Sequence, residues 1–548
     1  MDQKLDTNAK SSKTNTEIRT NGGSAKGSTE LKTVNWMASL MVIQLTSKFI
    51  HFSINTLIAR VMSPGDYGIS TLQFPFVFMA ITRLMKEALH RSALREKEDD
   101  EVIDFDQTNS PRTTKSKDAK LTQQTSKTHS IHSDNLVLLW WAIPCCIVLS
   151  SLLGYWFISW SPILQEHPWM IRGCLCWLIA AWVEISVEPI VIYAESKLMA
   201  NVTLIVECTS LLLQALGTAV MVYTLDSAAL LSSYGQLIYA LSLFSGYYIY
   251  AFVYDREIGR SIIPESFRIT GSMIKSAIGF IMQSVGKYAT AEGEHALLFF
   301  LATPQQQGVY EFVHNLGSII PRILFSSFEK TAFIMFARQK NNEGARLTVW
   351  TMLLNGSLMI SLLYIATCPS YVFFVVNLIY KQEWSHSEAP SLLILYGFYL
   401  LLIGINGLVE AHKDAVSPNH LIRRQAPFVF GFVGVYLVIG AACLNFFGVR
   451  GLIIASCIST IIRIVFNTYF FSEYLLPISK GIPTVGFWIV WTAVAVIGAV
   501  SHKILGDTWN HLAVGAASAG LVAIWFAFFS RKQLMGIYRM VRSKNKSE

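Results

Sequence analysis

The chain has 548 residues, of which 52% are hydrophobic and only 15% are charged, whereas ordinary soluble proteins carry roughly 25% charged residues. This composition excludes an ordinary soluble protein and indicates a membrane protein. The net charge of +8 requires no nucleic-acid partner, because the basic residues follow the topology signal described below.

The chain begins with a polar segment. Residues 1–33 contain almost nothing to bury, so they are predicted to be a disordered tail and not a signal peptide, which needs an apolar core. Fourteen apolar segments follow, each long enough to cross a hydrocarbon core that requires about 20 helical residues. They lie near residues 37–59, 67–85, 136–158, 172–194, 202–224, 229–252, 270–287, 309–337, 350–378, 390–411, 426–446, 450–471, 484–505 and 511–530.

Polar segments also interrupt and end the chain. Residues 95–134, between the second and third spans, are predicted to form a disordered cytosolic insertion, and residues 531–548 form a basic tail. Most of the 44 Lys and Arg residues fall on one side of the expected topology, which places both termini in the cytosol. The opposite side holds only Arg60, Arg172, Lys287, Lys381, Arg450 and Lys503.

No motif for catalysis or cofactor binding stands out. All eight cysteines lie in apolar segments, where a free cysteine behaves as a small hydrophobe, so we expect no disulfide framework and no metal site. The sequence contains no phosphate-binding loop, no H-E-x-x-H and no G-x-S-x-G motif. We therefore expect a protein that is not an enzyme and needs no cofactor.

The chain contains an internal repeat. "SPGDYGI" at 63–69 and "TPQQQGV" at 303–309 share a Ser/Thr-Pro pair, a glycine four residues after the proline, and a β-branched residue. Gln44, Lys48 and Arg83 flank the first copy at nearly the same spacing as Gln283, Lys287 and Arg322 flank the second. Six spans separate the copies, which predicts two six-helix halves of parallel orientation related by an axis along the membrane normal.

Ionisable and amide side chains recur inside the spans, where they are costly and usually face a cavity or each other. On helices they share faces, as Glu311, Asn315, Arg322 and Glu329 do in the segment 308–330. Two interpretations remain open: the polar groups pair across the bundle and hold it together, or they line a central cavity for a large anionic solute. The candidate substrate-binding residues are Lys48, Arg60, Arg83, Lys86, Glu87, Arg91, Glu184, Glu188, Lys287, Glu311, Asn315, Arg322, Glu329, Asn406, Glu410 and Arg463.

The cationic candidates suggest phosphate chemistry, because arginine forks and lysine point charges are the groups that bind phosphate oxygens. Arg83, Lys86 and Arg91 end the second span, and Lys287 and Arg322 lie in the second half. The alternative for the cluster at 83–91 is ordinary anchoring of the span on the cytosolic side. For Arg322 we expect the anionic solute as a partner when the cavity is full, and Glu311 or Glu329 as a partner when it is empty.

Several segments resemble the Rft family. They are "MKEALHRSAL" (85–94), "VEISVEP" (183–189), "EGEHALLFFL" (292–301), "QGVYEFVHNLGS" (307–318) and "INGLVEA" (405–411), and the resemblance extends over about 36–475. Lys86 and His90 stand where the family more often has arginine, so the carry-over is firmest for Glu87 and Arg91. These are eukaryotic endoplasmic-reticulum proteins related to bacterial lipid-linked precursor flippases and multidrug exporters.

The resemblance implies an all-α fold of two six-helix bundles around a central hydrophilic cavity. The expected units are a tail (1–35), a first bundle (36–254), a second bundle (255–471), two additional helices (472–530) and a tail (531–548). It also implies translocation of dolichyl-diphosphate oligosaccharide from the cytosolic to the lumenal leaflet of the endoplasmic-reticulum membrane. The alternatives are a glycolipid-binding or assembly factor, which presents the glycolipid to other N-glycosylation enzymes, and, more distantly, a polytopic transferase. We expect membrane lipids as neighbours, no nucleic acid and a monomer.

Overall fold

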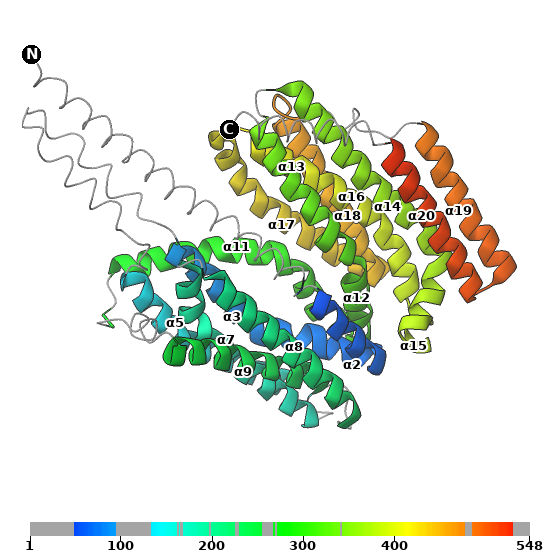
Figure 1. Cartoon of the computed structure of the whole chain (residues 1–548). Coiled ribbons are helices and arrows are strands. Elements are labelled where there is room, and N and C mark those ends of the chain that lie inside the picture. Colours follow the sequence, from blue (N-terminus) through cyan, green and yellow to red (C-terminus); the bar gives the residue numbers. More distant parts are fainter. Residues whose placement is uncertain are drawn as a thin grey trace, which may run out of the picture.

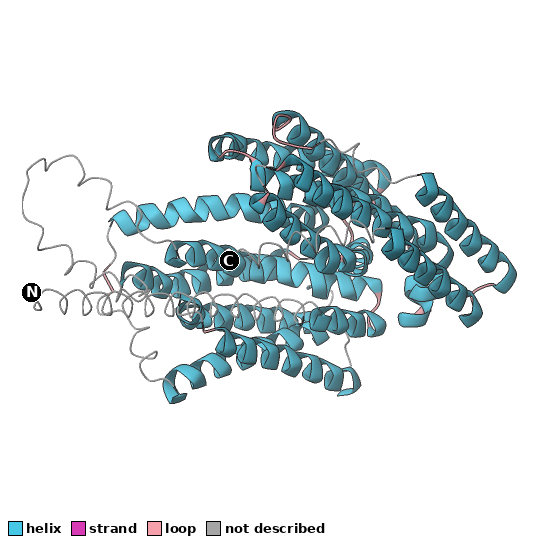
Figure 2. Cartoon of the chain, turned by 45° about the horizontal axis from the view of Figure 1, so that its top comes forward, coloured by secondary structure: helices cyan, strands magenta, loops and turns pink. Residues whose placement is uncertain are grey.

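Figure 1 shows a computed structural model of the chain. The residues that the structure describes are 49–94, 133–161, 168–196, 199–224, 230–254, 271–339, 342–476 and 485–529, together with Thr46, Leu164 and 267–268. The predicted tails at 1–35 and 531–548 and most of the predicted insertion at 95–134 lie outside these residues. Every regular element in the described part of the chain is a helix, as Figure 2 shows.

The first half is a bundle of apolar helices. It begins with a helix over Phe49–Val61 and continues with α2 (Pro64–Gly68), the π-helical turn η1 (Ile69–Gln73) and α3 (Phe74–Leu94). Then follow α5 (Ser133–Trp160), the short η2 (Pro168–Met170), α7 (Ile171–Ser196), α8 (Ala200–Thr224), α9 (Leu231–Ile249) and the π-helical η4 (Tyr250–Tyr254). Helix α3 packs against α5 and α7, and α9 packs between α7 and α8.

The second half of the chain begins with α11 (Gly271–Leu301). It continues with α12 (Pro304–Gly317), the π-helical η5 (Pro321–Phe325), α13 (Ser326–Arg338), α14 (Glu343–Ile379), α15 (Gln382–Ser385), α16 (Ala389–Val416), α17 (Asn419–Phe447) and α18 (Val449–Phe470). In Figure 1, α11 lies beside α3, whereas α13, α14 and α16 to α18 form a separate group. Helix α16 packs against α13, α14 and α18. Helix α11 packs against α3 of the first half as well as α17 of the second, so it joins the two halves.

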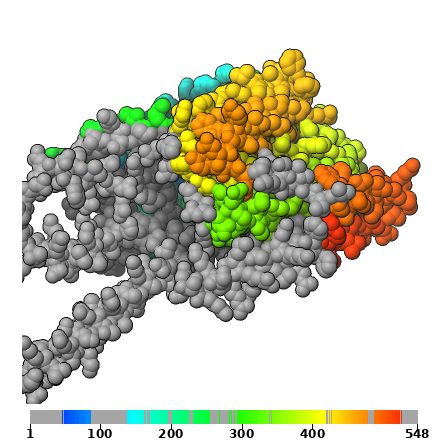
Figure 3. All heavy atoms as spheres, turned by 90° about the horizontal axis from the view of Figure 1, so that it is seen from above, coloured from blue at the N-terminus to red at the C-terminus, as the bar shows by residue number. Residues whose placement is uncertain are grey.

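Two further helices, α19 (Val485–Leu505) and α20 (Trp509–Phe529), follow the second half. Both pack against α14 and against each other. In Figure 3 they lie at the outer edge of the molecule, in orange and red. Like the outer faces of the other helices, they expose large apolar side chains such as Ile489, Ile504 and Leu521, as expected for surfaces in contact with lipid.

Ten helices among the described residues are long and apolar enough to cross a membrane. They match ten of the fourteen expected spans. The first expected span is described only from Phe49, and α11, α12 with α13, and α20 are helical without belonging to the ten. These helices confirm the prediction of a multi-pass helical membrane protein, whereas the number of fourteen spans stays a prediction.

The segment 308–330 is not one uninterrupted α-helix, contrary to the expectation that its polar residues share a face. Helix α12 ends at Gly317, the proline-containing turn η5 follows, and α13 begins at Ser326. A π-helical turn holds more residues than an α-helical turn, so it rotates everything after it relative to what precedes it. As a result, Glu311 contacts α11, whereas the Glu329 carboxylate rests against Gly407 of α16.

The two repeat motifs adopt the same local structure. Ser63 and Thr303 are N-caps with extended backbones, and their side-chain oxygens accept hydrogen bonds from the backbone N–H groups of Asp66 and Gln306. Each is followed by a proline at the first helical position, where the missing N–H is harmless. The motifs thus start α2 and α12 in the same way.

The glycines of the two motifs bring α2 and α12 into backbone contact. A Cβ placed on Gly68 would overlap the Pro304 carbonyl oxygen and lie 2.6 Å from Gly308 N. A Cβ on Gly308 would overlap the Pro64 carbonyl oxygen and lie 2.8 Å from Gly68 N. This reciprocal contact is what a two-fold relation between the halves would produce, since equivalent residues meet at the axis. It supports the predicted repeat.

Candidate functional site

An apolar contact joins the halves beside the two glycines. Trp384 is fully buried, donates a hydrogen bond from its indole N–H to the Ala59 carbonyl (2.7 Å), and stacks on Phe312 with ring centroids 4.4 Å apart. Tyr67 packs edge-on to Trp384, and Tyr380 packs edge-on to Phe312. We call Tyr67, Phe312, Tyr380 and Trp384 the aromatic lock. It belongs to the largest core cluster of the described residues, which contains side chains from both halves.

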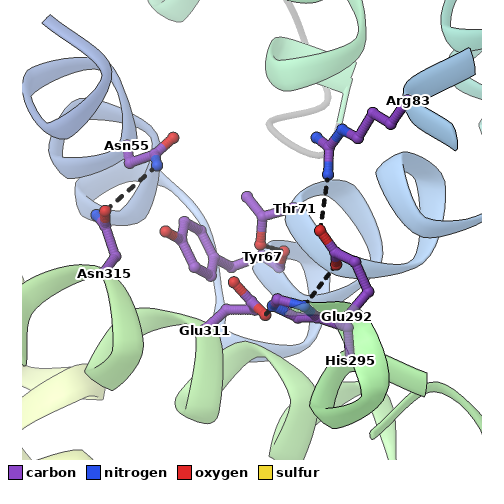
Figure 4. Close-up of polar contacts among 8 residues, drawn as sticks. All are labelled: Asn55, Tyr67, Thr71, Arg83, Glu292, His295, Glu311 and Asn315. Carbon is purple, nitrogen blue, oxygen red and sulfur yellow. Dashed lines mark hydrogen bonds and ion pairs between the residues drawn. The ribbon is translucent and has the colours of Figure 1, made fainter. Parts of the chain in front are cut away.

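A charged network also crosses between the halves (Figure 4). Arg83 of α3 forms an ion pair with Glu292 of α11, with Nη1 and Oε1 3.3 Å apart. The ring of His295 lies between two carboxylates: Nδ1 is 2.7 Å from Glu292 and Nε2 is 2.9 Å from Glu311 of α12. We call Arg83, Glu292, His295 and Glu311 the charged bridge. It ties α3, α11 and α12 together.

Further polar contacts join the two halves. Asn55 donates to the Asn315 amide oxygen at 3.5 Å (Figure 4). Gln73 donates to the Gln307 amide oxygen at 2.8 Å. Each pair has one residue from either half. Polar contacts as well as the apolar contacts of the aromatic lock therefore cross the interface between the halves.

Two arginines, one from each half, lie around the same histidine. Both Arg83 and Arg322 are within electrostatic range of His51 in the first helix. The Arg83 side chain is 50% exposed despite its ion pair, and Arg322 is exposed in η5. An anionic ligand can reach an arginine whose side chain stays accessible to solvent.

The charged candidates of the first half form a separate cluster. Lys86 lies 3.3 Å from a Glu184 oxygen and 3.6 Å from a Glu188 oxygen, and Gln236 of α9 also donates to Glu184. Glu184 and Glu188 are almost completely buried. This cluster holds α3, α7 and α9 together. Lys86, Glu184 and Glu188 therefore pair across the bundle in the described structure.

The candidates of the second half gather around α16. Glu410 forms an ion pair with Arg463 of α18, with Oε1 and Nη2 2.7 Å apart. Asn406 lies one turn before Glu410 on α16, and the Glu329 carboxylate of α13 rests against Gly407 of the same helix. The structure thus pairs Glu410 with Arg463 and places Glu329 against α16, which the sequence did not predict.

The remaining candidates are less informative. Arg60 is exposed at the end of the first described helix, and none of the ion pairs between described residues involves it. Lys48 lies outside the described residues. Glu87 and Arg91 lie in α3 and Lys287 in α11, but their side chains are also outside the described part of the structure.

Sequence reasoning did not single out Glu292 and His295 as site residues, although both stand in the segment "EGEHALLFFL". Their spacing of three residues places them on one helix face, and this was the available signal. Among the described residues, no group of three or more His, Cys, Asp and Glu side chains is arranged to hold a metal ion.

Comparison with known proteins gives the context for this site. A protein-family model described as "Rft protein" matches residues 32–540. A mouse relative named "Man(5)GlcNAc(2)-PP-dolichol translocation protein RFT1" is 25% identical over 549 residues, covering 92% of this chain and 95% of that protein. Relatives of the same name from Dictyostelium discoideum (24% identical; 77% and 82% covered) and Saccharomyces cerevisiae (22%; 79% and 82%) are also similar.

Solved structures show the same fold. "Lipid II flippase MurJ, inward closed conformation" superposes with a TM-score of 0.58 at 12% identity, covering 91% of this chain and all of that one. An inward-facing multidrug resistance MATE family transporter of the MOP superfamily gives a TM-score of 0.50 at 12% identity, covering 79% of this chain and 98% of that one. At such low identity these neighbours establish the fold alone. The match to the family model over most of the chain goes further: this chain is a member of the Rft protein family.

Proposed function

We propose that this protein moves dolichyl-diphosphate-linked oligosaccharide, the precursor of N-glycans, from the cytosolic to the lumenal leaflet of the endoplasmic-reticulum membrane. Family membership supports this proposal, since the relatives named above are called translocation proteins for such a lipid. The structural observation that carries it is the charged bridge between the halves, in which Arg83 stays half exposed.

In this proposal the two arginines bind the diphosphate. Arg83 can exchange one Glu292 oxygen for a phosphate oxygen without losing a charged partner, because both ligands are anionic and fit the guanidinium fork. Arg322 approaches from η5 of the other half. Amide groups nearby, on Asn55 and Asn315, suit the hydroxyl groups of a sugar because they both donate and accept hydrogen bonds.

The aromatic lock would close the lumenal end of the substrate path. Residues at this end, such as Arg60 and Lys381, belong to the side that the distribution of basic residues assigns to the lumen. Glycolipid would enter from the cytosolic leaflet, and separation of α2 from α12 would then release it to the lumenal leaflet. Fourteen spans, two six-helix halves, cytosolic termini and a monomer are parts of the same proposal. We assign no catalytic step to the protein.

The test of the proposal is whether Arg83 binds the substrate or only forms an ion pair with Glu292. Arg83→Gln is expected to abolish complementation of a glycosylation-deficient cell although the protein accumulates normally, and Arg83→Lys is expected to restore only part of it, because the fork is lost. The double variant Arg83→Gln, Glu292→Gln removes both charges of the ion pair, and it should still fail to complement the glycosylation-deficient cell.

The matched control is Arg450→Gln, because Arg450 also pairs with a glutamate, Glu388, at 3.8 Å, but on an exposed surface. That variant should complement fully, since exposed ion pairs contribute little. Recovery of glycosylation in the Arg83 and Glu292 double variant would mean that the pair is structural, and the substrate role of Arg83 would be wrong.

A further inference from the structure

The two C-terminal helices, α19 and α20, enclose one aromatic side chain of α14. The ring of Tyr371 lies between two glycines: a Cβ on Gly515 of α20 would lie 2.6 Å from it, and a Cβ on Gly498 of α19 would lie 3.5 Å from it. His511 of α20 stacks on the same ring, with ring centroids 4.1 Å apart and an angle of 13° between the planes. The pair of helices is therefore fitted to α14 at Tyr371.

Hydrogen bonds of His511 connect the three helices. Its Nε2 lies 3.0 Å from the carbonyl oxygen of Ser370 in α14, and its Nδ1 lies 2.8 Å from the hydroxyl oxygen of Ser501 in α19. A carbonyl oxygen can only accept a hydrogen bond, so Nε2 carries a proton and donates it. The His511 side chain is fully buried, so water does not compete for these contacts. His511 thus ties α14, α19 and α20 together.

A proline divides α14 directly before these contacts. Pro369 has no N–H to donate to the carbonyl group four residues earlier, and its ring crowds that carbonyl, so the helix is weakened at this point. In the segment before the proline, the indole N–H of Trp491 from α19 donates to the Leu362 carbonyl at 2.6 Å. An aromatic N–H group therefore donates to a carbonyl of α14 on each side of the proline.

The segment of α14 after Pro369 leads to the aromatic lock. Tyr380 caps the end of α14 about three turns later, and α15, which carries Trp384, follows directly. Val372 and Val376 of this segment belong to the same core cluster as the lock. Because a helical segment of this length moves as a unit, a displacement at its start is transmitted to Tyr380 and Trp384.

We propose that α19 and α20 keep the aromatic lock closed, and that His511 positions the segment of α14 after Pro369 for this purpose. His511 is a positioning residue, since it acts on the lock through Ser370 and Tyr371 without touching it. The inference goes beyond the proposed function, because it concerns the closed state and holds whichever ligand passes the lock. If the two helices contributed only stability, the contacts before and after the proline would have the same effect on the lock.

The test uses Thr56→Cys in the purified full-length protein, because the Thr56 hydroxyl lies 3.3 Å from the Tyr380 hydroxyl. The rate of modification by a maleimide is followed by mass spectrometry of the peptide that contains residue 56. His511→Phe keeps a ring on Tyr371 and loses the hydrogen bonds, so it should raise this rate about 2- to 10-fold, the factor that corresponds to one lost hydrogen bond. Trp491→Phe is the matched control: it also loses an N–H donor to α14, but before the proline, and it should leave the rate unchanged.

Two further variants make the result decisive. His511→Gln, whose amide group can still donate to a carbonyl, should restore part of the slow labelling. Val349→Cys, in the buried part of α14 before the proline, should stay unreactive; if it reacts in His511→Phe, that variant has unfolded, and Ser501→Ala, which removes the other partner of His511, decides instead by the same rise at residue 56. Unchanged labelling at residue 56 in both His511→Phe and Ser501→Ala would overturn the proposal, and so would an equal rise in Trp491→Phe.

Discussion

The contact between Gly68 and Gly308 predicts a variant that shifts the protein away from the described state. In Gly68→Ala the added methyl group would meet the Pro304 carbonyl oxygen and Gly308 N, and both belong to backbone, which cannot rotate aside as a side chain can. Inserting a methyl group into a packed contact typically costs about 1–3 kcal/mol. If the halves separate to relieve it, the population of the separated state rises about 5- to 150-fold.

The separation can be measured at Thr56, whose hydroxyl lies 3.3 Å from the Tyr380 hydroxyl beside the aromatic lock. A cysteine placed at Thr56 should react slowly with a membrane-impermeant maleimide in the wild-type background and faster in Gly68→Ala. Gly65→Ala is the matched control, because a Cβ on Gly65 of the same helix meets nothing within 4 Å. Labelling at Thr56 should stay slow in this control.

Unfolding would also increase labelling, so a second cysteine monitors the fold. Val349 is buried in a core cluster built from α13, α14 and α16, away from the contact of α2 with α12. A cysteine there should stay unreactive in Gly68→Ala. Equal labelling at Thr56 in Gly68→Ala and Gly65→Ala, together with full complementation by both, would refute the claim that this contact holds the halves together.

Three further predictions concern other parts of the molecule. Trp384→Phe removes the indole donor to Ala59 and should cost about 0.5–1.5 kcal/mol, seen as faster labelling at Thr56; unchanged labelling would mean that this hydrogen bond does not hold the lock. Lys86→Met leaves Glu184 and Glu188 buried without their cation and should lower the free energy of unfolding by about 3–5 kcal/mol, whereas Lys86→Met with Glu184→Gln and Glu188→Gln should recover much of it; full stability of the single variant would contradict a structural role. Arg322→Ala should abolish complementation while the protein accumulates normally, and reduced accumulation in pulse-chase experiments would instead assign Arg322 to structure.

The helical architecture can be predicted from the sequence, because backbone polar groups in lipid must be hydrogen-bonded within their own segment. Segments of about 20 apolar residues have few alternatives to a membrane-spanning helix. The motifs at 63–69 and 303–309 predict helix starts, because each has a capping residue followed by proline. The direction in which side chains point after a π-helical turn is harder to predict from the sequence than the helix itself. Pro321 indicates a disturbance, but the extra residue that turns Glu329 toward α16 depends on what packs there.

Partner choice among charged residues depends on tertiary packing, and for this reason the sequence leaves it open. Glu311 has His295 as its partner, and Lys86 has two glutamates of α7, although each was considered for the substrate site on the basis of residue type. The polar faces themselves were visible as i, i+3 and i, i+4 patterns. Which faces meet, and which cation stays exposed as Arg83 does, follows only from the arrangement of α3, α7, α11 and α12.

Reconstitution tests most directly whether the protein itself moves the glycolipid. Purified wild-type protein and Arg83→Gln are placed in liposomes with labelled dolichyl-diphosphate oligosaccharide, and the fraction that becomes accessible on the opposite leaflet is measured over time. We predict that the wild type exceeds protein-free liposomes, and that Arg83→Gln does not exceed them. Translocation by the wild type at the rate of empty liposomes, with glycolipid binding intact, would contradict the claim and favour a factor that binds the glycolipid without moving it.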